Sequence, residues 1–226
     1  MEFLIRLNLM ITAAIASIFM MEYAFAARIA LNSVKYSKNF TCCGLNPKTL
    51  SDEQKMKKPV VLVHGACHGH GVWKDFAESL QRSDVGPVFT VKVGKFGRPS
   101  ENDVEIVKRK IDEIKSLYDS DMPVDLVGYS RGGQVVVDAA EKHHKDVAKV
   151  ISLGYVPSSN QLNKSLVASG RYFEMAARYD FLFGYRPTNC GENHHGIANI
   201  GHLGLPFHLG VHQQIIEWLK QPSASV

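Results

Sequence analysis

Two kinds of segment alternate along most of the chain. Short runs of apolar, often β-branched residues are typical of strands covered on both faces, and longer segments with apolar residues every three or four positions are typical of amphipathic helices. Strands are expected at 60–63, 88–93, 124–127, 149–153, 172–179 and 197–200, and helices at 72–81, 104–114, 134–142, 164–169 and 211–219. This alternation predicts βαβ units and therefore an α/β fold, with a mainly parallel central sheet and helices on both faces.

Composition and charge narrow the classes of protein that fit. The 226 residues are 45% apolar and 21% charged, which excludes disorder and suffices for the core of one domain. The formal net charge is only +4, and the basic residues are scattered among acids. We therefore expect no nucleic-acid binding, and at most transient contact with anionic lipid surfaces. Six charges of the expected 104–114 helix most simply form a solvated face: Glu105, Lys108, Arg109, Lys110, Asp112 and Glu113.

The first 26 residues have the pattern of an export signal. Arg6 precedes an uncharged, largely apolar stretch from Leu7 to Met21, and Ala24-Phe25-Ala26 follows as a small-x-small cleavage site. This stretch of 15 residues is short for a bilayer, which needs about 20. We therefore expect cleavage after Ala26 or Ala27 and export to the periplasm or the medium, with an uncleaved anchor as the alternative.

Export would place four cysteines in an oxidising compartment, where one or two disulfides can form. The cysteines are Cys42, Cys43, Cys67 and Cys190, and they allow three complete pairings. Adjacent cysteines rarely bond to each other because the geometry is strained. A partner elsewhere for Cys42 or Cys43 is therefore the only expectation.

One motif stands between an expected strand and an expected helix. Gly128-Tyr129-Ser130-Arg131-Gly132 is a Gly-x-Ser-x-Gly pattern, which in this context is typical of a nucleophile elbow. The chain must reverse within a few residues, so Ser130 is expected in a strained conformation, with glycines that let the backbone pass closely. The alternative is a glycine-rich turn without chemistry or one that binds phosphate, although the lysine and the longer glycine loop of a phosphate cradle are missing.

A serine hydroxyl is a weak nucleophile at neutral pH, so it needs a histidine base and a carboxylate that orients the histidine. In sheets with such an elbow both follow the serine, first the acid and then the histidine. His202 fits best, because it lies between the expected last strand and the last helix, at the carboxyl end of the sheet. His195, His208 and a purely structural histidine are the alternatives.

The acid and the oxyanion donors are expected at the ends of other strands. Asp180 follows the strand at 172–179, and strand ends of such sheets carry chemistry. Glu192 is its rival, and an Asp180 that only closes a turn is the other alternative. The backbone N–H groups of Arg131, directly after the serine, and of Ala66, after the first strand, are the expected donors to an oxyanion.

The loop after the first strand is rich in possible metal ligands, namely His64, Cys67, His68 and His70. Their spacing matches no ligand pattern, and one loop rarely supplies four ligands. We therefore expect no metal and no other cofactor.

Together these stretches resemble the α/β-hydrolase superfamily, and within it the small lidless secreted lipases of bacteria. The motifs that carry the likeness are His64-Gly65, Gly-Tyr-Ser-Arg-Gly at 128–132, Asp180 and Gly201-His202-Leu203-Gly204, and the likeness runs from about Lys58 to Lys220. The resemblance implies Ser130 as nucleophile, Asp180 as acid, His202 as base, Ala66 and Arg131 as oxyanion donors, and carboxylic esters, including acylglycerols, as substrates. Those lipases often have Ala in place of Gly128 and Met in place of Arg131, and the Cys/His-rich turn at 67–70 is not typical of them.

We therefore expect an exported serine hydrolase, a lipase or esterase that acts as a monomer through an acyl-enzyme. The alternatives are thioesterase, amidase or acyltransferase chemistry on the same three side chains, or an exported binding protein without turnover. The expected domains are a signal peptide at 1–26, an N-terminal extension at 27–57 and a catalytic domain at 58–222.

The spacing of the candidate residues leaves no room for a cap domain. Only 49 residues separate Ser130 from Asp180, and they must hold two helices and two strands. The site is therefore expected to be open. Five nearby apolar residues are expected either to line an acyl groove or to belong to the core: Phe181, Leu182, Phe183, Leu205 and Phe207.

Overall fold

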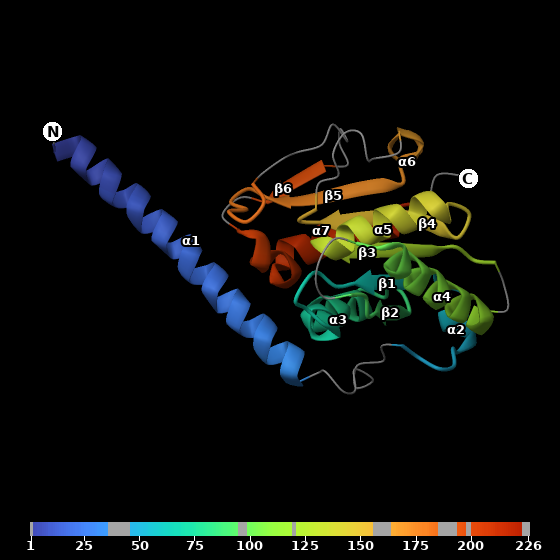
Figure 1. The fold of residues 1–226 in the computed structure, drawn as a ribbon. Helices are drawn as coiled ribbons and strands as arrows, with labels where there is room; N and C mark the ends of the chain where they lie inside the picture. Colours follow the sequence, from blue (N-terminus) through green and yellow to red (C-terminus); the bar gives the residue numbers. More distant parts are fainter. Residues whose placement is uncertain are drawn as a thin grey trace.

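A parallel sheet of six strands lies at the centre of the computed structural model, which describes residues 2–35, 46–94, 99–118, 121–155, 164–184, 194–197 and 200–222. The strands are β1 (Val60–Val63), β2 (Val88–Val91), β3 (Val124–Tyr129), β4 (Val147–Leu153), β5 (Tyr172–Ala177) and β6 (His194–Ile197). Their order is β2-β1-β3-β4-β5-β6, and every neighbouring pair is parallel. The predicted α/β fold with a parallel sheet is therefore confirmed (Figure 1).

Helices cover both faces of this sheet. They are α1 (Glu2–Lys35), α2 (Asp52–Lys55), η1 (His70–Trp73), α3 (Lys74–Arg82), α4 (Glu101–Tyr118), α5 (Arg131–Lys142), α6 (Lys164–Ala168), η3 (His202–Phe207) and α7 (Leu209–Lys220). One apolar core joins the sheet to α3, η3 and α7, and a second joins the opposite face to α4, α5 and α6. Both faces of the strands are thus buried, which explains their continuous apolar sequence. No cap domain is seen among the described residues.

Several element boundaries differ from the sequence expectation. The expected helix at 72–81 is divided into η1 and α3, and β2 ends at Val91. The last strand is His194–Ile197 rather than 197–200, and His202, which was expected between that strand and the last helix, begins the 3₁₀ helix η3. Ile200 looked like a strand residue because it is apolar, but it is buried in the core beside α7 without belonging to the sheet.

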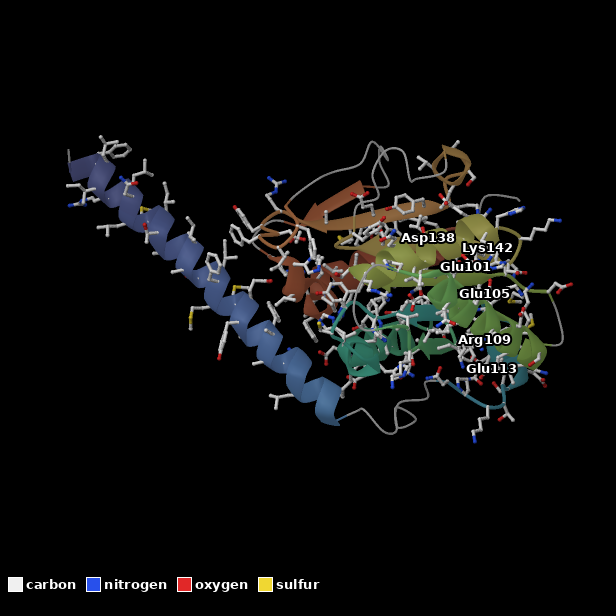
Figure 2. All side chains as sticks on the ribbon, viewed as in Figure 1. Glu101, Glu105, Arg109, Glu113, Asp138 and Lys142 are labelled. Carbon is white, nitrogen blue, oxygen red and sulfur yellow. The ribbon has the colours of Figure 1, made fainter. Side chains whose placement is uncertain are left out.

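The charged face predicted on α4 lies on the outer side of the domain, and α5 adds to it. Lys142 of α5 forms ion pairs with Glu101 and with Glu105, the latter at 2.8 Å between Nζ and Oε1. Arg109 and Glu113 continue the same face along α4 (Figure 2). This charged face lies on the side of the domain away from α1 (Figure 2).

Helix α1 is longer than the expected apolar stretch of an export signal. It runs without a break from Glu2 to Lys35, past the expected cleavage site, and its N-terminal half projects beyond the domain (Figure 1). The segment Phe3–Arg28 is, by its length and composition, long and apolar enough to cross a membrane. Cys67 is exposed and has a free thiol, whereas Cys42, Cys43 and Cys190 lie outside the described residues, so the disulfide expectation stays a prediction.

Candidate active site

Ser130 lies on a sharp turn between the end of β3 and the start of α5. Its backbone has φ 54° and ψ −123°, a region that side-chain-bearing residues rarely adopt and that costs about 1–3 kcal/mol. A Cβ atom on Gly128 would lie 2.2 Å from the carbonyl oxygen of Gly132, and one on Gly132 would lie 2.3 Å from that of Val63. The glycines are therefore needed for space, and the strained turn has the geometry expected of a nucleophile elbow.

Three side chains that are distant in sequence meet at this turn. His202 Nε2 lies 3.0 Å from Ser130 Oγ, and His202 Nδ1 lies 2.6 Å from Asp180 Oδ2. All three side chains are buried or nearly so. Because an ionised carboxylate can only accept, Nδ1 carries the proton that it donates to Asp180, which leaves Nε2 free to accept from the serine hydroxyl.

The carboxylate of Asp180 is fixed by the backbone that follows it. Its Oδ1 accepts hydrogen bonds from the N–H groups of Leu182, at 3.0 Å, and Phe183, at 2.9 Å. The other oxygen is thereby directed at His202. Asp180 lies three residues beyond the end of β5, at the carboxyl edge of the sheet, where the sequence placed it.

Two further residues hold His202 and were not identified from the sequence. The Tyr129 hydroxyl donates to the carbonyl oxygen of His202 at 3.2 Å, and burial raises the pKa of Tyr129 far enough that the hydroxyl keeps its proton. Gly154, after β4, has φ +62°, and a Cβ there would lie 2.9 Å from His202 Cε1. A signal for Tyr129 was available, since it directly precedes the serine, but its partner is 73 residues away.

The loop after β1 lies against Ser130, as the oxyanion expectation requires. A Cβ atom on Gly65 would lie 3.0 Å from Ser130 Cβ, so Ala66 follows directly from a point of close contact with the serine. Arg131 begins α5, and its guanidinium is turned to Asp103, with Nη2 2.6 Å from Oδ2, and to the carbonyl oxygen of Gly94. The backbone N–H of Arg131 therefore lies beside Ser130, whereas the charge of the Arg131 guanidinium is neutralised by Asp103.

The pair between Arg131 and Asp103 is buried and densely hydrogen-bonded. Burial alone would raise the pKa of Asp103, but bonds from the N–H groups of Gly94 and Ser100, from the Ser100 hydroxyl and from Arg131 outweigh it and lower the pKa to about 2. Asp103 is therefore ionised, and the pair ties the start of α5 to α4.

The alternative residues weighed from the sequence lie apart from this arrangement or outside the description. The side chain of His195 and all of Glu192 are outside the described residues. His208 lies between η3 and α7. Burial lowers the pKa of His68 to about 4, so this histidine is neutral. Among the residues that the structure describes, no three His, Cys, Asp or Glu side chains are placed to hold a metal ion.

The apolar residues expected near the site divide into two groups. Leu205 and Phe207 are buried in the core. Phe181, Leu182 and Phe183 are 51–60% exposed, and the Phe183 ring lies 4.7 Å from the imidazole of His202. The 181–183 segment thus forms an exposed apolar rim beside the site.

A comparison with known families agrees with this geometry. A family model described as "alpha/beta hydrolase fold" matches residues 58–188, more than half of the chain. The chain belongs to the alpha/beta hydrolase family. Among curated proteins, salicylic acid-binding protein 2 of Nicotiana tabacum is 31% identical over 119 residues. That match covers 46% of this hydrolase and 42% of the tobacco protein, so this chain spans less than half of that relative's length.

Solved structures of other alpha/beta hydrolases share the fold. A monoacylglycerol lipase of Paleococcus ferrophilus has a TM-score of 0.51 and 16% identity, covering 72% of this hydrolase and 95% of that chain. The Bacillus licheniformis lipase BlEst2 has a TM-score of 0.52 and 15% identity, and the match covers 76% of this hydrolase and 96% of that chain. A membrane phospholipase A, a bacterial virulence factor, has a TM-score of 0.53 and 13% identity, and the match covers 98% of this hydrolase and 99% of that chain. These neighbours include lipases, and the likeness at such identities is one of fold.

Proposed function

We propose that this hydrolase is a serine hydrolase that cleaves carboxylic esters through an acyl-enzyme, with Ser130 as nucleophile, His202 as base and Asp180 as acid. The observation that carries the proposal is the position of the His202 imidazole, within hydrogen-bond distance of the serine hydroxyl on one side and of the carboxylate on the other. A histidine held in this way is able both to take the serine proton and to return it.

The reaction then has two symmetrical halves. Ser130 Oγ forms a bond to the ester carbonyl carbon while His202 Nε2 takes its proton, and the carbonyl oxygen becomes an oxyanion. The carbon–oxygen bond to the alcohol breaks as Nε2 returns the proton to the alcohol, which leaves an acyl-serine. Water attacks the acyl carbon in the same manner, releases the carboxylic acid and restores Ser130.

The oxyanion is assigned to two backbone donors in this proposal. The N–H groups of Ala66 and Arg131 are the candidates, because the loop after β1 contacts Ser130 and Arg131 directly follows it. Loss of one such donor in an enzyme of this type costs about 2.7–4 kcal/mol of transition-state stabilisation. No cofactor or metal enters any step.

The exposed rim supports an apolar acyl group in the substrate. Phe181, Leu182 and Phe183 are exposed beside His202, and none of the described segments forms a cap domain over them, so an acylglycerol or a short-chain ester can reach the serine from solvent or from a lipid surface. The structural neighbours include a monoacylglycerol lipase and a membrane phospholipase A, and the latter likeness extends over 98% of this chain. We also propose that residues 1–26 direct export, and that 58–222 form the catalytic domain after an extension at 27–57.

Replacement of Ser130 by Ala tests this proposal. We expect Ser130→Ala to lower kcat for p-nitrophenyl esters at least about 10⁴-fold, with unchanged thermal unfolding, because only the nucleophile is lost. Ser116→Ala, at an exposed serine of α4, is the matched control and should keep full activity. Retained turnover in Ser130→Ala, or no labelling of wild-type Ser130 by a fluorophosphonate, contradicts the proposal. A panel of esters, thioesters and amides separates esterase chemistry from the thioesterase and amidase alternatives.

A further inference from the structure

Helix α1 packs against the domain through one narrow face. Among its described side chains, Ile18, Glu22, Phe25 and Ala26 are partly buried and all the others are exposed. The spacing of these four residues places them on one side of the helix. We call this set the docked face. Glu22 is also the only charged residue between Leu7 and Ala27, so the single charge of the apolar stretch points toward the domain.

Contacts of α1 with the domain converge on the segment that carries His202. Glu22 Oε2 accepts a hydrogen bond from the N–H of Leu203 at 2.8 Å. Phe25 stacks on Phe207 at the other end of η3, with ring centroids 5.7 Å apart. Arg28 lies over the same Phe207 ring and forms an ion pair of 2.6 Å with Asp75 of α3.

A second contact reaches the acid side of the site. The ring of Phe19 stacks on that of Phe181, with centroids 5.2 Å apart. Phe181 directly follows Asp180 and belongs to the exposed rim. Helix α1 therefore touches the segments on both sides of the Asp180–His202 hydrogen bond.

The His202 turn is shaped to receive this helix. A Cβ atom on Gly201 would lie 2.4 Å from Cδ of Glu22, and one on Gly204 would lie 2.6 Å from Cγ1 of Ile200 and 2.9 Å from Cε2 of Phe25. Neither glycine has a positive φ, so backbone conformation does not require glycine at these positions. Gly201 thus leaves the space that Glu22 occupies, whereas the space at Gly204 is shared by Ile200 of the domain and Phe25 of the docked face.

We propose that α1 stays attached in the functioning hydrolase and that Glu22, through its hydrogen bond to Leu203, is a positioning residue for His202; this rests on the role of His202 as the base. If residues 1–26 were removed after export, the Glu22 carboxylate and the space beside Gly201 that it occupies would have no role in the mature protein. Retention explains both, because Glu22 then holds the backbone directly after His202 and the Tyr129 hydroxyl holds the carbonyl of His202 itself.

The exposed, apolar N-terminal part of α1 indicates what kind of partner covers it. Before the docked face begins at Ile18, the side chains from Phe3 to Ser17 are all exposed, and this part of the helix extends over roughly 22 Å at 1.5 Å per residue, most of the hydrocarbon thickness of a bilayer of about 30 Å. The charged face of α4 and α5 lies on the opposite side of the domain, where it faces water (Figure 2). A lipid bilayer is therefore the expected occupant of the exposed part of α1, with the apolar rim at 181–183 on the same side as the membrane.

Kinetics of Glu22 variants in the full chain test the positioning role. We expect Glu22→Ala to lower kcat about 10- to 100-fold, because a misplaced catalytic group has effects of this size, while KM changes less than about threefold. Glu22→Gln keeps an oxygen that accepts from Leu203 and should recover most of the lost kcat. Tyr23→Ala, at the exposed neighbour of Glu22, is the matched control and should match the wild type. Wild-type kcat in Glu22→Ala, or a loss confined to KM, overturns the positioning role.

Gly201→Ala is a second variant that tests the positioning role of Glu22 if Glu22→Ala does not fold. Its Cβ would displace Glu22 without removing the carboxylate, and we expect a comparable loss of kcat; wild-type kcat in this variant overturns the proposal. Fluorophosphonate labelling of the wild type separates the two levels of inference. An unlabelled wild type contradicts the proposed serine hydrolase, whereas a labelled wild type with an unaffected Glu22→Ala contradicts only the role of Glu22.

Retention of α1 has a test that does not depend on turnover. The full chain with a C-terminal tag is produced in cells that export it, the membrane and soluble fractions are separated, and the intact mass of the tagged protein is measured. We expect a membrane-bound protein whose mass includes residues 1–26. A soluble protein that begins at residue 27 or 28 overturns the proposal.

Discussion

The two ends of the parallel sheet both bury charge, but they do so for different purposes. At the carboxyl end, Asp180 and His202 lie beside an exposed rim, so that the histidine reaches the serine and a substrate reaches both. On the far part of the sheet, the buried Nζ of Lys149 in β4 donates to the carbonyl oxygens of Trp218, at 2.7 Å, and Leu219, at 3.2 Å. It also donates to Gln221.

The two buried groups differ in what they contact. Lys149 donates to carbonyl groups at the end of α7, where the last turn of a helix has no N–H donors of its own for all of them, and burial lowers the pKa of this lysine. All three N–H groups of its ammonium donate to main-chain oxygens, so no donor is left to bind a ligand. The imidazole of His202 instead links two polar groups, one of which is a strained serine. A buried ionisable group that contacts a reactive side chain indicates chemistry. One that bonds only to main-chain carbonyl oxygens indicates a role in stability.

A change of Asp180 tests the catalytic role proposed for the carboxyl end of the sheet. Asp180→Asn should lower kcat about 10⁴-fold, because the amide can donate to Nδ1 and thus favour the wrong tautomer of His202. The free energy of unfolding should change little, since Asn keeps an oxygen that accepts from Leu182 and Phe183. Steady-state kinetics and urea unfolding measure the two quantities. Asp52→Asn, at an exposed aspartate of α2, is the control, and a kcat within tenfold of wild type in Asp180→Asn contradicts the assignment.

The next effect tests the structural end. Lys149→Met should lower the free energy of unfolding by about 3 kcal/mol, because it removes three hydrogen bonds to carbonyl oxygens at the end of α7 and the cation near the buried Asp125. Chemical unfolding measures the loss. Among molecules that remain folded, kcat should be unchanged, since Lys149 has no contact with the site. Lys145→Met, at an exposed lysine, should have no effect on either quantity. A large fall in kcat without a fall in stability would contradict the division between the two ends.

The sequence predicted the arrangement around Ser130 where its causes are local. The elbow could be recognised because its strain, its glycines and its flanking strand and helix lie within a few residues of Ser130. Asp180 and His202 followed from chain order and strand ends, and the structure brings both to Ser130. The last strand was placed three residues too late, because an apolar Ile200 buried by tertiary packing has the same local pattern as a strand residue.

The supports of the site could not be predicted, because their partners are far away in the chain. Glu22 and Leu203 are 181 residues apart, and in isolation Glu22 belongs to a pattern typical of an export signal. Nothing local distinguishes a glycine at 201 that makes a turn from one that leaves space for another helix. The role of α1 appears only when the packing around His202 is known.

The ion pair between Asp103 and Arg131 lies beside Ser130, and we expect its loss to have the smallest effect on the free energy of unfolding. Asp103 has a pKa of about 2, below its usual value near 3.8, so its ionised form stabilises the fold fully above pH 4 to 5 and the contribution is lost as the pH falls through 2. Asp103→Asn should therefore lower the free energy of unfolding by about 1–2 kcal/mol at pH 7, and the difference from wild type should shrink toward pH 2. Urea unfolding at several pH values measures this, with kcat at pH 7 expected within about threefold of wild type. If the stability difference stayed constant with pH while kcat collapsed, Asp103 and Arg131 would belong to the catalytic machinery rather than to the scaffold beside it.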